Sequence, residues 1–382
     1  MKIVIVTTYP FPSSQAPGNR VLFFINSLSK LPNVQIRVIC DVKDVSYISS
    51  PGHQVPGKPI IINVQSIPFE RKNLILRAFY ELIHTYKMYT KISKSVDFVI
   101  FTIPSIQLMF FSLLMKKNTF ALDIRDLVWE YLSKRNLLGY LARVIIRVLF
   151  QLSAKRASFV STTNDHQASL IKKLTTKSCV LIPNGISRSK YEALKKCSHD
   201  YSDTETVNIS YIGNLGIAQN LSTLIDAASK FPDICFNIIG DGTMRSKLAG
   251  DTNKRGLENV KFWGLKPWPE VVDFMTQSTI LYAQIDDQFN SAVPTKIFEY
   301  IAVGKKVVLG LPDGIARDIF QEFSGVFIYE SGSIDGLVFS LKEALAVNDI
   351  DFASNHALLE KKYIRDNFEE TFIQAVLSPP QG

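Results

Sequence analysis

The stretch VPTKIFEYIAVGKKVV (residues 293–308) places a short apolar helix directly before a valine-rich run. The apolar side chains before Gly304 recur at helical spacing, and the run after it has the composition of a buried strand. A helix that feeds a buried strand is the repeating unit of α/β proteins. Two charged residues, Lys296 and Glu299, interrupt the apolar helix on one of its faces.

The same alternation of strand and helix continues along the whole chain of 382 residues. Short β-branched runs predict strands at residues 2–7, 35–40, 59–64, 97–101, 119–123, 158–161 and 178–182, and then at 207–212, 235–239, 260–263, 280–283, 306–309 and 325–328. Helical patterns fall at residues 20–31, 73–94, 137–154, 221–230, 294–302 and 333–345. The pattern predicts two doubly wound α/β domains that face a central cleft, with ligands at the carboxyl ends of parallel strands.

The boundary between these domains is predicted from a polar stretch without apolar periodicity, residues 187–206, which we interpret as a linker. The expected division is an N-terminal domain over residues 1–186 and a C-terminal domain over 187–360. Residues 361–382 are expected to form a helical tail that packs back on the N-terminal domain. A chain of this length suits two domains.

Composition limits the class of protein. The 43 basic and 35 acidic residues give a net charge of +8, which is compatible with phosphorylated ligands or anionic surfaces. The four cysteines are scattered without a C-x-x-C pair, as in a cytoplasmic protein with reduced thiols, and the histidines lack metal-ligand spacing. The apolar segments 100–115 and 137–152 are interrupted by polar residues, so we expect a soluble or peripheral protein.

Glycine-containing loops follow several predicted strands. The first strand leads into a long loop that ends in Gly18 at a helix start, close to Arg20, where an anion could bind. An ordinary surface loop remains an alternative reading there. In the second half, YIGNLG and IIGDG follow strands and contain Gly213, Asn214, Gly216, Gly240 and Gly242. Glycine lets the backbone approach a phosphate or a base, and two such turns favour a nucleotide site.

Lys296 and Glu299 fit the same nucleotide hypothesis. An ammonium group can hold a diphosphate, and a carboxylate can accept both hydroxyls of a ribose. The alternative is a surface ion pair, worth about 0.2–0.5 kcal/mol. The helix offers little polar surface, and desolvated charges need partners, which a ligand provides.

Five segments in order resemble the second domain of family-4 retaining glycosyltransferases of the GT-B fold. They are IPNGI (182–186), YIGNLG (211–216), IIGDG (238–242), VKFWGLKP (260–267) and PTKIFEYIAVGKKVV (294–308). In the first half, LDIRDLVWE (122–130) resembles the R-D-x-W-P-E stretch of bacterial O-antigen and capsule enzymes that use UDP-linked N-acetylated sugars, such as N-acetyl-fucosamine transferases.

The resemblance implies roles for particular residues. Glu299 matches the ribose-binding glutamate that ends the family's E-x7-E signature, and Lys296 is the expected diphosphate ligand and catalytic cation. Asp126 or Arg125 is expected to face the transferred sugar, with the Gly18 loop closing over phosphate and acceptor. The remaining binding positions lie in the donor domain: main-chain groups of Val293, Pro294 and Thr295 toward the phosphates, and Gly240, Gly242, Trp263, Leu265 and Lys266 around the base.

Two departures from the family pattern concern the donor. The first glutamate of E-x7-E falls at Ser291, so its contact to a donor hydroxyl is missing. The Arg and Lys that many members carry after the glycine turn are replaced by Asn214 and by Ala218 or Gln219. The donor sugar is therefore the least determined part of the assignment.

The resemblance also implies a mechanism and partners. We expect retention of anomeric configuration, no metal and no cofactor, and a nucleoside diphosphate leaving group that Lys296 and the helix start stabilise. The acceptor is expected to be a polyprenyl-diphosphate-linked saccharide in O-antigen or capsule synthesis, which places the protein at the inner face of the cell membrane.

Basic amphipathic segments agree with a membrane partner. Residues 131–164 contain six Lys or Arg and no acidic residue, with aliphatic side chains between them, and residues 71–94 are similar. Ordinary solvated cations on helices that flank a sheet are the alternative. Nucleic acid is not expected as a partner, because no aromatic platform or known motif accompanies the cations.

Two other functions remain open from the sequence. A UDP-sugar 2-epimerase has the same architecture, although it needs acid–base carboxylates and a histidine in the cleft. A non-catalytic partner subunit that binds a nucleotide without turnover is compatible with the Ser291 departure.

Overall fold

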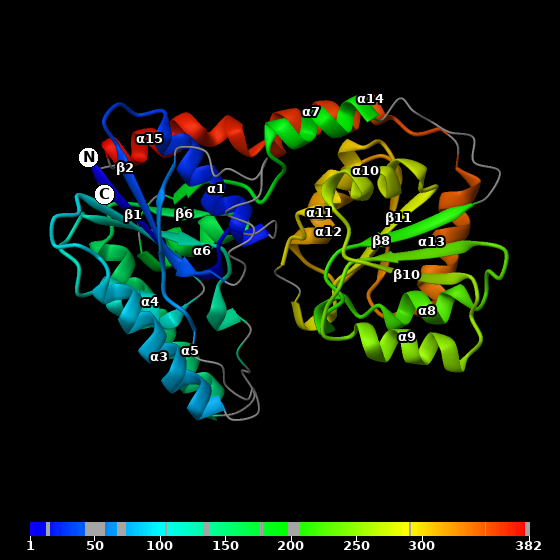
Figure 1. The fold of residues 1–382 in the computed structure, drawn as a ribbon, viewed down its shortest axis with the longest axis horizontal. Helices are drawn as coiled ribbons and strands as arrows, with labels where there is room; N and C mark the ends of the chain where they lie inside the picture. Colours follow the sequence, from blue (N-terminus) through cyan, green and yellow to red (C-terminus); the bar gives the residue numbers. More distant parts are fainter. Residues whose placement is uncertain are drawn as a thin grey trace. The chain divides into compact units, whose positions relative to one another are not determined.

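The computed structural model describes residues 1–12, 16–42, 58–66, 74–103, 105–130, 132, 137–175, 177, 179–197, 207–289, 292–347 and 349–378. The chain forms two compact units (Figure 1). The first contains Met1–Pro183 and Arg365–Gly382, and the second contains Asn184–Ile364. The divisions predicted from the sequence lie after residues 186 and 360. They move because Ile186 forms a parallel β-bridge with Ile364, which keeps both connecting segments in the second unit.

The first unit is built on a parallel sheet with the strand order β3-β2-β1-β4-β5-β6-β7. Its strands are β1 (Lys2–Pro10), β2 (Gln35–Asp41), β3 (Ile60–Asn63), β4 (Phe98–Ile103), β5 (Phe120–Ile124), β6 (Val160–Thr162) and β7 (Cys179–Leu181). Its helices are α1 (Ala16–Ser29), α3 (Leu74–Thr90), α4 (Ile106–Ser112), α5 (Leu137–Arg156), α6 (Asp165–Thr175) and α15 (Glu369–Leu377). Three-residue and four-residue 3₁₀ turns occur at Val128–Glu130 and Arg365–Phe368.

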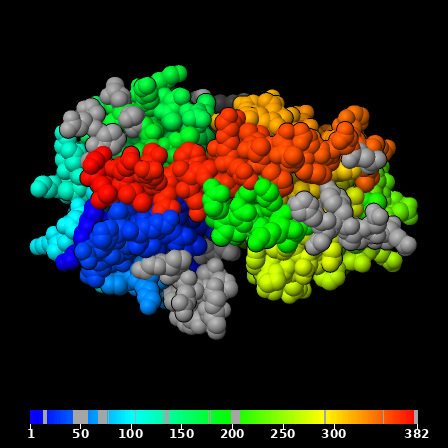
Figure 2. Space-filling view, turned by 90° about the horizontal axis from the view of Figure 1, so that it is seen from above, coloured from blue at the N-terminus to red at the C-terminus, as the bar shows by residue number. Residues whose placement is uncertain are grey.

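Helices cover both faces of this sheet. Alternate residues of β1 enter different cores: Ile3 and Ile5 pack with α1 and α15, whereas Val4 and Val6 pack with the layer that contains α4 and α5. The period of two along a strand explains why the whole strand is apolar in sequence. Figure 2 shows α15 beside α1, where the Phe24 and Phe372 ring centroids lie 4.9 Å apart.

The second unit is also doubly wound, on a parallel sheet with the order β10-β9-β8-β11-β12-β13. Its strands are β8 (Asn208–Ile212), β9 (Cys235–Ile239), β10 (Val260–Gly264), β11 (Ile280–Gln284), β12 (Lys306–Leu311) and β13 (Val326–Glu330). Its helices are α7 (Arg188–Cys197), α8 (Ser222–Ala228), α9 (Arg245–Lys254), α10 (Trp268–Gln277), α11 (Lys296–Ala302), α12 (Ile315–Phe320), α13 (Ile334–Ala346) and α14 (Phe352–Leu358). Short 3₁₀ turns lie at Ile217–Gln219 and Asp287–Phe289, and a π turn at Leu359–Tyr363.

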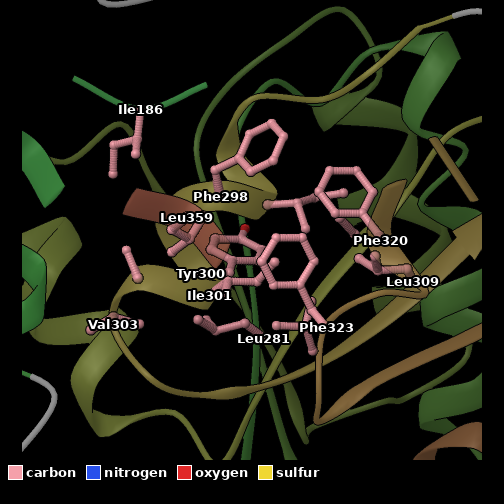
Figure 3. Close-up of a cluster of buried hydrophobic side chains, with 14 of the residues drawn as sticks. Ile186, Leu281, Phe298, Tyr300, Ile301, Val303, Leu309, Phe320, Phe323 and Leu359 are labelled. Atoms are coloured by element: carbon pink, nitrogen blue, oxygen red, sulfur yellow. The ribbon is translucent and has the colours of Figure 1, made fainter. Parts of the chain in front are cut away.

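The helix that opened the sequence analysis, α11, is one wall of a core on one face of this sheet. Figure 3 shows Phe298 and Ile301 of α11 among Leu281, Leu309 and Phe320. The two units confirm the predicted fold class of two doubly wound α/β domains, and each predicted strand is present.

The strand order of each sheet reverses at one place, between β1 and β4 in the first unit and between β8 and β11 in the second. Ligands of doubly wound sheets bind at the carboxyl ends of the strands beside such a reversal. In the second unit this position is occupied by the Gly213 loop, which follows β8, and by α11, which follows β11.

The predicted linker is wrong over half of its length. Residues 188–197 form helix α7, whose Tyr191 and Leu194 are fully buried in the same core as α11. The sequence concealed this helix because only Tyr191 and Leu194 are fully buried, with Cys197 packed at the edge of the core, and most of the other side chains are charged or polar.

Helix α5 is longer than the sequence analysis allowed. It spans 20 residues and is long and apolar enough to cross a membrane by length and composition. One face nevertheless packs on the first unit through Ile146, Phe150 and Ala154. The Ser153 hydroxyl also hydrogen-bonds Ser112 of α4 at 2.5 Å.

The glycine of the IPNGI segment is required by packing. Gly185 precedes Ile186, whose main-chain N–H donates to the Tyr363 carbonyl at 3.0 Å. A Cβ on Gly185 would overlap that same carbonyl group. The close pairing of the two connecting segments therefore depends on the missing side chain.

We expect Gly185→Ala to lower the free energy of unfolding by about 1–3 kcal/mol, because the backbone of residue 363 must shift. Chemical denaturation measures this change. Gly250→Ala is the matched control: its Cβ meets no atom within 4 Å on α9, and alanine favours the helix. Equal stability of the two variants would contradict the packing argument.

Candidate functional site

Lys296, the first residue of α11, lies over the ring of Tyr211 at the end of β8. Its Nζ is 4.1 Å from the ring centroid and donates a hydrogen bond to the Tyr211 hydroxyl at 2.8 Å. That hydroxyl in turn donates to the Asn214 carbonyl at 2.6 Å. Burial lowers the pKa of Lys296 to about 7, with Glu299 acting in the opposite direction. This cation is thus held beside the glycine turn with weak compensation of its charge.

The glycine turn is shaped around this lysine. A Cβ on Gly213 would overlap the Lys296 ammonium group, and Gly213 has a φ of +154°, which residues with side chains rarely adopt. Main-chain hydrogen bonds tie the turn to the next loop: Gly213 donates to Ile239 and Leu215 donates to Asp241, both at 2.9 Å. The predicted glycine loops therefore meet at one edge of the sheet.

Two neutral side chains close the turn at the positions where the resemblance expects cations. The Gln219 side-chain oxygen accepts from the Gly216 N–H at 3.1 Å and from the Asn214 amide at 3.3 Å. Asn214 and Gln219 therefore shape the loop and add no positive charge to it.

Tyr300 fixes α11 against β8. Its hydroxyl donates to the Ile212 carbonyl and accepts from the Ile212 N–H, both at 3.0 Å. Because Ile212 directly precedes Gly213, this buried contact sets the distance between the glycine turn and the charged residues of α11. Burial raises the pKa of Tyr300, so the phenol stays neutral and keeps its proton for the carbonyl.

Glu299 has a partner that the sequence analysis missed. Its Oε1 accepts a hydrogen bond from the Lys190 ammonium of α7 at 2.9 Å. The same ammonium lies 4.3 Å from the Trp268 ring centroid. The available signal was the pair Tyr191 and Leu194 at helical spacing, which would have placed Lys190 on a helix rather than in a linker.

The predicted base-side residues are distributed over β10 and the following turn. Gly240 donates a main-chain hydrogen bond to Gly264 at 2.8 Å, so the loops after β9 and β10 also meet. The Trp263 indole donates to Asn237 at 2.8 Å, and Leu265 is exposed.

The contacts of the other residues predicted to bind the donor do not by themselves indicate a ligand. Lys266, which precedes α10, pairs with Glu270 in the first turn of that helix at 2.7 Å, and Gly242 packs against the Leu215 carbonyl. Residues Val293, Pro294 and Thr295 directly precede α11, whereas Ser291 lies outside the described residues. Since α11 has only seven residues, Lys296 is the main positive charge at its start.

Arg20 has a structural role, contrary to its predicted contact with an anion. Its buried guanidinium donates to both carboxylate oxygens of Asp123, at 2.6 to 3.0 Å, and to the Ile182 carbonyl at 2.6 Å. Ser161 donates to the same carboxylate at 2.7 Å. Gly18 is also buried, in the first turn of α1. These contacts join α1, β5, β6 and the segment after β7.

Arg125 contrasts with Arg20. It follows β5 and is buried, yet among the residues that the structure describes its Nε and Nη1 atoms have no hydrogen-bond partner. Its guanidinium lies 5.2 Å from the centroid of the Tyr9 ring, a residue that the sequence analysis did not select. Burial raises the pKa of Tyr9, Arg125 opposes this shift, and Asp126 adds to it.

Tyr9, Arg125 and Asp126 thus gather at the carboxyl ends of β1 and β5. Buried donors without partners need acceptor atoms, and a ligand with hydroxyl or phosphate oxygens supplies them. The rest of the LDIRDLVWE segment is structural: the Trp129 and Phe150 ring centroids lie 4.9 Å apart, and Glu130 pairs with Arg143 at 2.8 Å.

Comparison with known proteins identifies what the second unit and the whole fold resemble. The family model described as "Glycosyl transferases group 1" matches residues 201–358, which lie in the second unit. The second unit matches the group 1 glycosyl transferases. WcaI of Escherichia coli (strain K12), which is named as a colanic acid biosynthesis glycosyl transferase, is 26% identical over 151 residues. That alignment covers 38% of this chain and only 37% of WcaI.

Solved structures show the likeness over the whole chain. Sucrose-phosphate synthase from Thermosynechococcus elongatus matches with a TM-score of 0.70 and 12% identity, over 98% of this chain and 97% of its own. Anabaena HepE in complex with UDP and glucose matches with a TM-score of 0.66 and 15% identity, over 99% of this chain and 100% of its own. WaaG, a glycosyltransferase involved in lipopolysaccharide biosynthesis, matches with a TM-score of 0.65 and 13% identity, over 98% of this chain and 100% of its own. The fold is therefore the GT-B type.

We expect Arg20→Met to lower the free energy of unfolding by about 3–5 kcal/mol, because Asp123 is left buried and unpaired. Denaturant titration measures this loss. Lys30→Met removes the ion pair between Lys30, which is 64% exposed, and Glu369. This change should alter the free energy of unfolding by about 1 kcal/mol or less. An Arg20→Met protein of wild-type stability would reinstate Arg20 as a ligand-binding residue.

Proposed function

We propose that the protein is a retaining glycosyltransferase that moves a sugar from a nucleotide-sugar, a UDP-linked N-acetylated sugar, to a lipid-linked saccharide. One observation carries the proposal: the Lys296 ammonium lies against a glycine turn at the reversal of strand order, one helical turn from Glu299. A diphosphate needs a cation and close backbone approach, and a ribose needs an acceptor carboxylate. The family match to the second unit supports the same reading.

In this proposal the donor lies along the carboxyl edge of the second sheet. Lys296 holds the diphosphate, and the Gly213 turn allows the phosphate oxygens to approach the backbone. Glu299 accepts the ribose hydroxyls, and the turns at Gly240 and Leu265 receive the base. The resemblance to HepE, whose structure contains UDP and glucose, supports a UDP donor.

The chemical step needs stabilisation of the leaving group. The bond from the anomeric carbon to the β-phosphate oxygen breaks, and a bond from that carbon to an acceptor hydroxyl oxygen forms on the same face. The acceptor proton passes to the departing phosphate, and Lys296 neutralises the charge that develops there. We propose this route without a metal, because the lysine supplies the positive charge.

The first unit is proposed to bind the sugar and acceptor through Arg125 and Asp126. The unpartnered Arg125 donors suit hydroxyl or phosphate oxygens, and the Tyr9 ring supplies an apolar face. The names of WcaI and WaaG point to colanic acid and lipopolysaccharide, which supports a role in bacterial surface polysaccharide synthesis, such as O-antigen or capsule.

We also propose a cytoplasmic location at the inner membrane face, which the proposed acceptor requires and the surface of the first unit supports. Helices α3, α4 and α5 are neighbours in the first unit (Figure 1), and their outer faces carry exposed apolar side chains. On these helices and the turn after α4, the exposed set is Leu76, Phe79, Leu82, Tyr86, Phe110, Leu114, Leu137, Leu138, Tyr140, Leu141, Val144, Ile145, Val148 and Leu152. Exposed cations accompany them, among them Lys87, Lys91 and Lys155. A surface of this composition suits the boundary of an anionic bilayer.

Because one face of α5 packs on the sheet, we propose that this helix lies on the membrane and does not cross it. Two cations of α5 have partners within the first unit. Arg143 pairs with Glu130, and Arg156 donates to the Met115 carbonyl at 2.7 Å, so both hold α5 in place.

We expect Lys296→Gln to lower kcat by about 10²-fold or more, because the charge that stabilises the departing diphosphate is lost. Release of UDP in the presence of acceptor measures turnover. Lys362→Gln, which removes an exposed pair with Glu322 in the same unit, should leave kcat unchanged. A nucleotide panel of UDP, GDP, ADP and dTDP in a thermal-shift assay should show stabilisation by UDP.

The pH dependence provides a second readout for the same lysine. With the pKa of Lys296 at about 7, the free protein loses this proton above neutral pH. We expect a bound diphosphate to raise this pKa, because a nearby anion favours the charged form of the lysine. UDP affinity should therefore fall between pH 7.5 and 9, by up to about tenfold per unit, and the fall should be absent in Lys296→Gln.

Two results would contradict the proposed function itself. Wild-type turnover in Lys296→Gln would remove the lysine from the reaction. Conversion of UDP-N-acetylglucosamine to another sugar without any acceptor would identify an epimerase instead.

We expect the protein to float with vesicles that contain phosphatidylglycerol and not with phosphatidylcholine alone. The double variant Leu138→Glu, Ile145→Glu should lose flotation, because these side chains are 80% and 65% exposed on α5. Phe339→Glu places the same charge at a 65% exposed position of α13 and should float normally. Binding without lipid dependence would refute the membrane proposal.

A further inference from the structure

Lys190 and Glu299 form an ion pair that differs from the surface pairs of this chain. Their side chains are 29% and 16% exposed, whereas the Lys195–Glu360 pair, which uses the same helix α7, is 40% and 45% exposed. Lower exposure strengthens the interaction and restricts both side chains. The Lys190–Glu299 pair is thus a more defined contact than its neighbour.

Trp268 restricts the lysine further. The Lys190 Nζ lies 4.3 Å from the indole centroid and 2.9 Å from Glu299 Oε1, so the ammonium is held between a ring and a carboxylate. A cation over an indole face gains electrostatic attraction beyond its ion pair. A lysine held in this way orients the carboxylate that it contacts.

The backbone around the pair is equally fixed. Tyr191 follows Lys190 and is fully buried, and α7 packs against α11 through the core that also contains Phe298. The hydrogen bond from Lys190 reaches Glu299 Oε1 and restricts the orientations that the carboxylate can adopt.

We propose that Lys190 is a positioning residue that holds Glu299 in the orientation needed to accept the vicinal hydroxyls of a nucleotide ribose. The inference rests on the proposed function, in which Glu299 binds the donor ribose. Lys190 acts through Glu299, so its effect depends on the ribose hydroxyls and not on the base or the diphosphate.

The test compares UDP with 2′,3′-dideoxy-UDP by calorimetric titration. We expect the wild-type protein to bind UDP more tightly than the dideoxy nucleotide. Lys190→Met should weaken UDP binding by about tenfold and leave dideoxy-UDP binding unchanged, because only the contact to the hydroxyls is lost. Lys190→Arg keeps a donor for Glu299 and should stay within about threefold of the wild type.

The matched control is Lys195→Met, which removes the outer ion pair of α7 and should change neither affinity. Unfolding curves establish whether each variant folds. If Lys190→Met does not fold, Lys190→Gln replaces it in the titrations. If wild type prefers UDP and Lys190→Met prefers it equally, or loses both ligands equally, the positioning role is refuted while the donor site stands. If wild type binds both nucleotides equally, the ribose role of Glu299 fails, and the inference fails with it.

Discussion

The arrangement of the second unit depends on a lysine ammonium held against a tyrosine ring beside a glycine that has no side chain. Lys296 reaches this place only because Gly213 leaves the space open, and it stays there because the Tyr211 hydroxyl accepts its hydrogen bond. Tyr300 sets the approach of α11 to β8 through both main-chain groups of Ile212. A partly buried cation with so few compensating contacts is costly, and an anionic ligand removes that cost.

The two arginines of the first unit illustrate how partners decide the role of a residue. Arg20 and Arg125 are both buried cations near the carboxyl end of β5. Asp123 satisfies Arg20, which thereby becomes part of the framework. The Nε and Nη1 donors of Arg125 lack such a partner within the described ranges, so its geometry supports contact with a ligand. The residue type alone could not distinguish the structural role of Arg20 from the ligand-binding role proposed for Arg125.

Much of the fold could be predicted because buried parallel strands have a distinctive composition. Strands such as β8 and β12 are apolar on both faces, and the glycine turns follow them directly. Helix α7 was missed because few of its side chains contact the core: Tyr191 and Leu194 are buried, and Cys197 packs at its edge. Lys190 was missed with it, since a contact between α7 and α11 is a tertiary fact that no local pattern encodes. Tyr9 was missed for the same reason.

The most direct test of the account is a crystal structure of the protein with UDP. We expect a diphosphate oxygen within hydrogen-bond distance of the Lys296 Nζ and both ribose hydroxyls on Glu299. UDP bound away from the Gly213 turn, with Lys296 contacting only Tyr211, would contradict it.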